Sequence, residues 1–378
     1  MKILMTPARF RPYSGGVENY VFSLSRELVG LGHEVTVLCA NEPESDKEEL
    51  LDGVRVRRIR YIGKVANTNI TPGLPMEMMR ADFDLVHTHL PTPWSADVSW
   101  IAAGLKRRPL VLTYYNDIVG EGFAGRIAQL YNGTGLKLLL RRAAKIIIIQ
   151  PGYIDSSPHL RRYRDKIETI PVGVDLSRFR PTNEATDGKT LFFLSSLDRY
   201  HRYKGLQDLL SALTMAKEEV CDLKLIVAGC GELQSHYKEM AEDLRVAGCV
   251  DFVGFIPEEM LAKHYNRCDI FILPSTSRSQ EGFGMVALEA MACGKPVICS
   301  NIVGVAEDIE EMGAGLTVEP SNPKELAGAI IRLLKDGPVA KEMGSAGRRL
   351  AEERYGWRGV AERVEGVYEE LVGPRKSG

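Results

Sequence analysis

Apolar and polar positions follow two different periods along this chain. In the first half, five apolar residues recur at helical spacing and predict one buried face of a helix: Val17, Tyr20, Val21, Leu24 and Leu28. Short runs rich in β-branched residues predict strands over residues 2–5, 34–39, 54–59, 85–88, 110–113 and 145–149. Strands that alternate with amphipathic helices are typical of parallel α/β sheets.

The second half repeats this alternation after a break. Residues 180–188 combine Pro, Gly and small polar residues without an apolar period, which indicates a linker. Further strands are predicted over residues 191–195, 223–228, 250–254, 270–273, 296–299 and 315–318. Helical patterns over residues 323–334 and 357–371 complete the chain.

The 378 residues therefore predict two Rossmann-like domains, each with a doubly wound parallel sheet. We expect an N-terminal domain at 1–180 and a C-terminal domain at 181–355, with a helix in 356–378 that crosses back onto the first domain. Open α/β sheets bind ligands beyond the carboxyl ends of their strands. Two such domains would face each other across a deep cleft.

The composition is that of a soluble globular protein, with 44% hydrophobic and 26% charged residues. The longest aliphatic run, 146–149, is far shorter than the roughly 20 residues of a spanning helix, so we expect neither a transmembrane helix nor a signal peptide. The seven cysteines include no Cys-x-x-Cys pair, which favours a reducing, cytoplasmic compartment and argues against a zinc site.

Charge is divided unevenly between the two halves. Up to Arg180 there are 25 basic and 19 acidic residues, which leaves 23 of the 48 basic and 31 of the 50 acidic residues for the rest. Three basic clusters, at 55–60, 106–108 and 141–145, account for much of the N-terminal excess. They are typical of a solvated face, and the alternative is peripheral contact with an anionic membrane, on the inner face of the cell membrane.

Two glycine-containing segments suit phosphate binding. Gly15 and Gly16 follow the first predicted strand and open a helix, where backbone amides can hold an anion, although a glycine pair is equally typical of a plain tight turn. The second segment leaves a buried strand, passes Glu281 and Gly284, and enters a helix that carries Glu289. Carboxylates on both sides of an anion site suit a diphosphate between two hydroxylated rings; the alternative is that Glu281 caps the helix and Glu289 forms a surface ion pair.

Four segments, in order along nearly the whole chain, resemble the motifs of family 4 retaining glycosyltransferases of the GT-B fold: Gly15-Gly16-Val-Glu, Ile170-Pro-Val-Gly-Val-Asp175, Tyr203-Lys204-Gly205 and Glu281-x7-Glu289. The resemblance implies that Glu281 contacts the transferred sugar and that Glu289 binds ribose. It implies that Lys204 and the amides of Gly15 and Gly16 stabilise the leaving diphosphate. The other implied donor-binding positions are Gly254, Phe255 and Ile256 at the base, and Phe283, Gly284, Met285 and Val286 along the sugar and diphosphate.

Two positions depart from the family pattern. Tyr115 stands where a histidine often lies near the donor sugar, and Ser196 stands where an arginine usually precedes the lysine. Arg199, in preference to Arg202, is our candidate for the missing cation, and an exposed loop charge is the alternative. The catalytic candidates are thus Glu281, Lys204, Arg199 and Tyr115.

The resemblance implies that the N-terminal domain, 1–180, binds the acceptor and that the C-terminal domain, 181–355, binds the donor. Four further residues are candidates for the acceptor side of the cleft: Arg9, His89, Asn116 and Asp117. His89 ends a predicted strand and is expected at the cleft mouth, whereas His87 is expected to be structural. The apolar and basic stretch 136–145 suits a lipid-linked acceptor, and an ordinary core-packing helix with a basic outer face is the alternative.

Together these features predict a metal-independent retaining hexosyltransferase that uses no cofactor. Its partners would be a UDP- or GDP-linked sugar and a glycan or lipid-linked acceptor of cell-envelope or glycan biosynthesis, and not nucleic acid. A lysine and two helix N-termini can stabilise the leaving diphosphate without a metal ion. Two alternatives remain: a nucleotide-sugar epimerase or hydrolase of the same fold, and a catalytically weakened subunit that binds nucleotide sugar.

Overall fold

A computed structural model describes residues 1–13, 15–65, 68–118, 122–150, 152–182, 184, 186, 188–278 and 280–373. The chain divides into two compact units. The first unit comprises Met1–Gly173 with Trp357–Gly378, and the second comprises Val174–Gly356. Arg180, where we expected the boundary, thus lies inside the second unit. The C-terminal helix belongs to the first unit.

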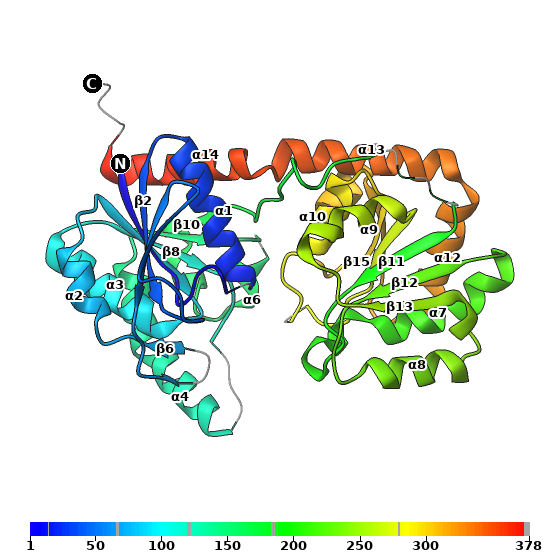
Figure 1. Cartoon of the computed structure of the whole chain (residues 1–378), viewed down its shortest axis with the longest axis horizontal. Helices are drawn as coiled ribbons and strands as arrows, with labels where there is room; N and C mark the ends of the chain where they lie inside the picture. Colours follow the sequence, from blue (N-terminus) through cyan, green and yellow to red (C-terminus); the bar gives the residue numbers. More distant parts are fainter. Residues whose placement is uncertain are drawn as a thin grey trace. The chain divides into compact units, whose positions relative to one another are not determined.

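The first unit contains an eight-stranded sheet in the order β10-β9-β8-β7-β1-β2-β4-β3, in which only β3 and β4 pair in an antiparallel manner. Figure 1 labels β2, β8 and β10 of this sheet. Its strands are β1 (Lys2–Thr6), β2 (Glu34–Ala40), β3 (Glu48–Leu51), β4 (Val54–Ile59), β7 (Leu85–Leu90), β8 (Leu110–Tyr114), β9 (Lys145–Ile148) and β10 (Ile167–Thr169). A separate hairpin joins β5 (Gly63–Val65) to β6 (Thr68–Ile70).

Helices cover both faces of this sheet. They are α1 (Gly16–Gly30), α2 (Leu74–Arg80), α3 (Pro93–Lys106), α4 (Gly122–Gly133), α5 (Gly135–Arg142), α6 (Tyr153–Ser156), the 3-10 helix η1 (Arg161–Lys166) and α14 (Trp357–Val372). Successive strand side chains point to opposite faces. On one face, Leu4, Val86 and Leu112 pack with α2, α3 and α5. On the opposite face, His87, which follows Val86 on β7, contacts Tyr368 of α14. Helix α14 packs beside α1.

The second unit contains a six-stranded sheet in the order β13-β12-β11-β14-β15-β16, and all of its pairings are parallel. Its strands are β11 (Thr190–Leu194), β12 (Lys224–Ala228), β13 (Val250–Gly254), β14 (Ile270–Leu273), β15 (Val297–Ser300) and β16 (Gly315–Val318). The helices are η2 (Arg199–Lys204), α7 (Leu206–Glu219), α8 (Gln234–Asp243), η3 (Ala247–Cys249), η4 (Glu258–Met260), α9 (Leu261–Arg267), α10 (Met285–Ala292), α11 (Ala306–Met312), α12 (Pro323–Lys335) and α13 (Gly337–Arg354).

One core layer of the second unit lies between its sheet and the helices α7 and α12. Leu209, Leu213 and Ile330 are fully buried there against strand residues such as Leu225 and Ile272. Within the described part of the chain, no helix is both long enough and apolar enough to cross a membrane. The fold thus provides two α/β units, each with loops at the carboxyl ends of its strands.

Candidate functional site

Lys204 and Glu281 come together at the carboxyl end of the second sheet. Lys204 ends η2, and Glu281 lies in the loop that follows β14. Between Lys204 and α7, Gly205 adopts a left-handed φ of 79°, and a Cβ there would lie 1.9 Å from the carbonyl oxygen of Pro274. Only glycine permits this close approach of the two loops, which holds Lys204 beside Glu281.

The Lys204 ammonium lies 3.0 Å from Oε1 and 2.9 Å from Oε2 of Glu281. The Glu281 side chain is 2% exposed and that of Lys204 is 16% exposed. The hydroxyl of Ser275 donates a further hydrogen bond to Oε2. Burial, reinforced by the Glu281 charge, raises the pKa of the nearby Tyr203 to about 12. This carboxylate is therefore held in place from two sides, and the reading of Glu281 as a helix cap is wrong.

The helix that follows, α10, begins at a position that requires glycine. Gly284 has a φ of 85°, and a Cβ there would lie 2.5 Å from Cγ1 of Val303. Phe283 is buried next to it and packs edge-on against Tyr355 at 5.5 Å. The amides of Met285 and Val286 form the first turn, where the helix dipole favours an anion. The loop thus places a potential anion site directly after Glu281.

Glu289 lies further along α10 and is partly buried. Its Oε2 accepts a hydrogen bond of 2.7 Å from the hydroxyl of Tyr265. Burial raises the pKa of Glu289 to about 7, and the Tyr265 hydrogen bond and the Arg178 charge offset this effect only partly. The described contact of Glu289 is therefore a hydrogen bond from a buried tyrosine, not the surface ion pair of the alternative interpretation.

The loops after β11, β12 and β13 meet at the same end of the sheet. Gly229 has a φ of 124°, and its Cβ would lie only 1.7 Å from the carbonyl oxygen of Ser195. The amide of Gly229 donates to the carbonyl oxygen of Gly254 at 2.8 Å. Beyond Gly254, whose φ is 73°, Phe255 is 75% exposed and Ile256 is buried. The exposed ring of Phe255 is available to a planar base.

Sequence reasoning missed three contributors to this site. Ser275 and Tyr265 bond to the two carboxylates, and Gly229 brings three loops together. The segment Gly229-Cys-Gly231 directly after a strand was a readable signal of close backbone approach. Nothing in the spacing of Tyr265 pointed to Glu289, because they lie on different helices.

Family models match both halves of the chain. The model described as Glycosyltransferase Family 4 matches residues 14–178, and that described as Glycosyl transferases group 1 matches residues 178–350. The two matches meet at residue 178 and agree with the order of the motifs.

This chain is a family 4 glycosyltransferase. It is 28% identical over 382 residues to the phosphatidyl-myo-inositol mannosyltransferase of Mycolicibacterium smegmatis, covering 96% of this chain and 93% of that protein. It is 29% identical over 351 residues to the D-rhamnosyltransferase WbpZ of Pseudomonas aeruginosa, covering 90% of this chain and 87% of that protein. The structure of Anabaena HepE in complex with UDP matches with a TM-score of 0.76 at 20% identity, covering 98% of this chain and 100% of that chain. This likeness shows the GT-B fold, with its two Rossmann-like domains.

In this glycosyltransferase, Arg199 does not contact the Lys204 and Glu281 pair. Its side chain is 71% exposed, and its Nε lies 3.1 Å from Oε1 of Glu232. Arg202 is also exposed. Asp198 caps η2 by accepting hydrogen bonds from two backbone amides, which fixes the loop that carries both arginines. The role of Arg199 as a substitute cation thus stays a prediction.

The first unit presents its glycine turn at the start of α1. Gly15 is the N-cap and is extended, and a Cβ on Gly16 would meet no atom within 4 Å. In the first turn Glu18 is nearly buried, 3.4 Å from Nε of Arg9, whose guanidinium lies 4.1 Å from the centre of the Tyr13 ring. Burial raises the pKa of Glu18. A Cβ on Gly15, in contrast, would lie 2.5 Å from Oε2 of Glu18, so the carboxylate of this internal ion pair lies beside the start of the helix.

The expectation that His89 reaches the cleft mouth is wrong. Its side chain is fully buried, and its Nδ1 lies 3.2 Å from the hydroxyl of the partly buried Tyr115, with the two rings stacked. His87 lies beneath it between the hydroxyls of Tyr368 and Thr113, each at 2.6 Å. Burial lowers the pKa of His87 to about 3 and that of His89 well below its usual value. Because β7 is central and covered on both faces, its end is not exposed.

Asn116 and Asp117 follow β8 and differ in their surroundings. Asn116 is exposed. Asp117 accepts hydrogen bonds of 2.6 Å from the hydroxyls of Tyr114 and Ser157, and its amide donates to the hydroxyl of Tyr153 at 2.8 Å. Asp117 therefore shapes the loop, and Asn116 remains available to a ligand.

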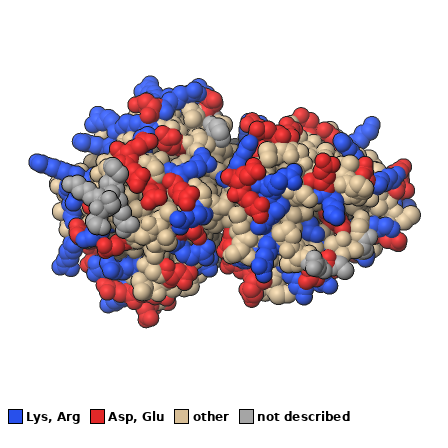
Figure 2. Space-filling model, turned by 90° about the horizontal axis from the view of Figure 1, so that it is seen from above, with Lys and Arg blue, Asp and Glu red and all other residues tan. Residues whose placement is uncertain are grey.

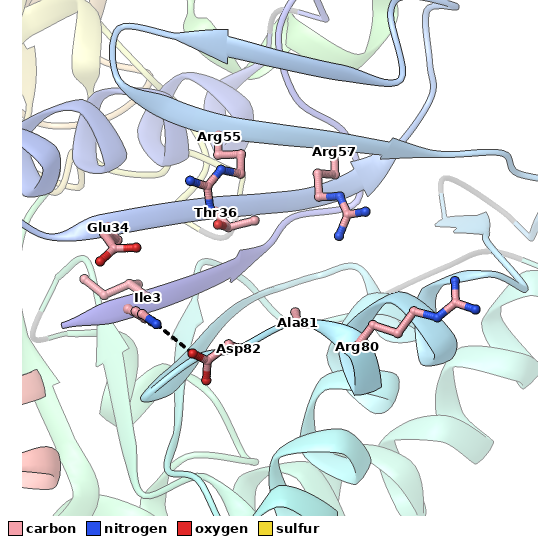
Figure 3. A pocket seen from close by; sticks show the side chains of 9 residues that line it. Ile3, Glu34, Thr36, Arg55, Arg57, Arg80, Ala81 and Asp82 are labelled. Carbon is pink, nitrogen blue, oxygen red and sulfur yellow. Dashed lines mark hydrogen bonds and ion pairs between the residues drawn. The ribbon is translucent and has the colours of Figure 1, made fainter.

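The basic cluster at 55–60 is partly internal. Figure 3 shows Arg55 and Arg57 over a pocket of about 220 Å³ at the amino ends of β1, β2 and β4, the sheet end opposite the glycine turn. Arg57 bonds to Glu48 at 2.9 Å. Arg58 is buried and bonds to Glu49 at 2.6 Å. On the face seen in Figure 2, basic and acidic side chains are interspersed.

No group of three or more His, Cys, Asp or Glu side chains suited to hold a metal ion occurs among the residues for which coordinates are described. All seven cysteines are free. Within the second unit, the site brings together one lysine, two carboxylates, hydroxyl donors and the N-terminus of α10.

Proposed function

We propose that this glycosyltransferase transfers a hexosyl group from a UDP- or GDP-linked sugar to a hydroxyl of a glycan or lipid-linked acceptor, with retention at the anomeric carbon and without a metal ion. The observation that carries the proposal is the Lys204–Glu281 pair immediately before the N-terminus of α10. Mannosyl and rhamnosyl transfer by two relatives, and the UDP complex of a protein of the same fold, support the donor class.

In this mechanism the bond between the anomeric carbon and the diphosphate oxygen breaks, and the acceptor oxygen bonds to the same face of that carbon. The acceptor proton passes to the leaving phosphate, so no protein base is required. Lys204 and the amides of α10, with those of Gly15 and Gly16, would stabilise the developing negative charge. Glu281 would orient the transferred sugar, and Glu289 would accept hydrogen bonds from the ribose hydroxyls.

The donor class is tested by thermal denaturation with nucleoside diphosphates and their sugars. A ligand that binds only the folded state raises the melting temperature. We expect UDP or GDP and their sugars to raise it, and nucleoside monophosphates to have a smaller effect. Proton NMR of the first product then gives the anomeric configuration, and turnover in EDTA tests the absence of a metal requirement.

One observation favours a second candidate, a subunit that binds nucleotide sugar with weakened catalysis. Tyr115 stands at the position of the usual histidine and contacts the buried His89, and Ser196, at the position of the usual arginine, carries no charge. Binding of a nucleoside diphosphate without hydrolysis or transfer, across a panel of donors and acceptors, would favour this candidate.

Peripheral contact with an anionic membrane is a further part of the proposal. Basic surface residues are the feature that would mediate this contact. In α5, Leu136, Leu139 and Leu140 are buried in the core, whereas Arg141 and Arg142 are exposed. This supports the interpretation of a core-packing helix with a basic outer face. Flotation with anionic liposomes at low salt tests the contact, and salt should abolish it.

A further inference from the structure

The first unit contains an apolar cavity of about 380 Å³ beside the loop that follows β8. Its walls come from the β5–β6 hairpin, the start of α3, the residues after β8, and helix α4 (Figure 1). The side chains that form most of it are Val65, Ile70, Trp94, Ile118, Ile127 and Tyr131. The volume lies in the range of small-molecule sites, roughly 300 to 1,000 Å³.

Four polar groups of the cavity wall, on Trp94, Asp97, Asp117 and Tyr131, are already bonded within the protein. The indole N–H of Trp94 donates to Oγ1 of Thr71 at 3.0 Å. The hydroxyl of Tyr131 donates to Asp97 at 2.9 Å, and Asp117 accepts the two hydroxyl bonds described above. The wall therefore offers an occupant mainly apolar contact and few hydrogen bonds.

The charge of the cavity lining further limits the class of ligand that can bind. The cavity lining that the structure describes contains the carboxylates of Asp97 and Asp117 and no Lys, Arg or His. A phosphate or another anion would be repelled here and would find no counter-charge. Two apolar side chains of the wall, Val65 at 50% and Ile127 at 42% exposure, are in contact with water. An uncharged apolar group would cover them.

We propose that this cavity binds an uncharged apolar group of the acceptor, an alkyl chain or comparable aglycone, next to the hydroxyl that receives the sugar. The exposed Asn116 on the cavity lining supplies the polar contact for the sugar or hydroxyl end of that acceptor. The assignment to an acceptor rests on the proposed function. It is consistent with the position of Asn116, which belongs to the loop at the carboxyl end of the first sheet, where α/β sheets bind their ligands. The cavity itself is a property of the first unit alone.

The probe is n-octyl β-D-glucopyranoside below its critical micelle concentration, with methyl β-D-glucopyranoside as the matched compound without the chain. We expect calorimetry on the full chain to give a dissociation constant at least about 100-fold lower for the octyl compound, since each buried methylene adds about 0.8 kcal/mol. Equal affinities would overturn the proposal in favour of a site that recognises only the sugar. Tighter binding of octyl phosphate than of octyl glucoside would overturn the choice of an uncharged ligand.

Two variants on α4 localise the binding. Ile127→Glu places a charge on the cavity wall and should weaken octyl glucoside binding by at least about tenfold. Leu130→Glu, on the same helix but outside the cavity lining and 70% exposed, should leave it within about twofold. Val65→Glu, on the part of the wall that β5 forms, should reproduce the effect of Ile127→Glu. Equal loss in the Leu130 variant, or no loss in either cavity variant, would show adsorption elsewhere and contradict the proposal.

The nucleoside diphosphate melting shift separates this proposal from the proposed function. The donor-binding residues of the second unit are unchanged in all three variants, so UDP or GDP should still raise the melting temperature. Octyl glucoside binding at the cavity without any nucleotide effect would contradict the proposed transfer reaction and leave the apolar site standing. A melting shift with UDP or GDP but no octyl glucoside binding would contradict the cavity proposal and leave donor binding standing.

Discussion

The Lys204 ammonium contacts both carboxylate oxygens of Glu281, at 3.0 and 2.9 Å, in a pair that is nearly excluded from solvent. In the proposed mechanism Lys204 would neutralise the leaving diphosphate and Glu281 would bind the transferred sugar. Without the donor, the two side chains bind each other. Entry of the donor would let the phosphates share the lysine while sugar hydroxyls satisfy the carboxylate. In the proposed mechanism, the same two residues would serve both the stability of the second unit and catalysis.

We predict that Lys204→Met lowers kcat/KM by roughly 10²- to 10³-fold, because aimed positive charge at the leaving group is lost. It should also destabilise the fold by up to about 3 kcal/mol, since the buried Glu281 loses its partner. Steady-state kinetics and urea denaturation measure the two effects.

The double variant Lys204→Met with Glu281→Gln separates the effect on kcat/KM from the effect on stability. Removing both charges should restore most of the stability without restoring turnover. Lys335→Met, on the surface of the same unit, is the matched lysine control and should change neither quantity appreciably. Recovery of turnover in the double variant would refute the assigned charge role of Lys204.

Donor affinity should depend on pH through Glu289, whose pKa is about 7. Only the ionised carboxylate accepts hydrogen bonds from two ribose hydroxyls with both of its oxygens. We expect the donor dissociation constant to rise as pH falls below 7, by at most about tenfold per pH unit. Calorimetric titrations between pH 5.5 and 8.5 would measure it, and Glu289→Gln should flatten the profile at a weaker affinity.

The same group links pH to stability. Its pKa is raised on folding, so between the ordinary value of 4.5 and about 7 the folded state binds more protons than the unfolded state. The stability that Glu289 contributes is therefore complete below that window and is lost as pH rises through it. The difference in unfolding free energy between the parent and Glu289→Gln should change across this window and remain constant above it. A constant difference throughout would show that the pKa is not raised.

Much of the fold was predictable from the sequence, because buried β-branched runs mark parallel strands strongly. The bounds of β4, β13, β14 and β16 agree with prediction. The short β3, β5, β6 and β10 were missed, because runs of three or four residues carry little periodic signal. The helix α13 was missed as well, because Gly and Ala dilute its apolar face.

The site was less predictable wherever it depends on contacts between distant segments. Lys204 and Glu281 could be named from their motifs, but their pairing depends on Gly205 meeting Pro274. His89 was misplaced because its burial is produced by Tyr20 from α1 and by Tyr115, which no spacing on β7 reveals.

Gly205→Ala should destabilise the protein by more than about 2 kcal/mol. The added Cβ would combine a left-handed backbone with a clash against the Pro274 carbonyl, and neither can relax without moving a loop. Gly328→Ala is the matched control, because it lies within α12 with no atom near an added Cβ. It should stabilise the protein by about 0.5 to 1 kcal/mol. Denaturant unfolding of both variants decides the prediction, and comparable effects would contradict it.

Arg199→Ala tests whether this arginine replaces the charge missing at Ser196. If Arg199 leaves Glu232 for the diphosphate, its removal should raise the donor dissociation constant by roughly tenfold, the value of one charge-assisted contact. Glu232→Ala frees the arginine and should have the opposite or no effect on affinity. If donor affinity is unchanged in Arg199→Ala, Arg199 serves only the exposed ion pair with Glu232.

Tyr115 and His89 should act through a neutral hydrogen bond and not through a titrating histidine. Because the pKa of His89 lies well below its usual value, kcat/KM should show no inflection that belongs to His89 between pH 6 and 8. Tyr115→Phe removes the hydroxyl that meets Nδ1 of the buried His89 and should cost about 1 to 3 kcal/mol of stability. Tyr115→His restores the usual family residue, and its kcat should rise if the tyrosine weakens catalysis, with the nucleoside diphosphate affinity unchanged. A fall in kcat with retained affinity would instead show that the tyrosine hydroxyl itself serves the transfer step in this enzyme.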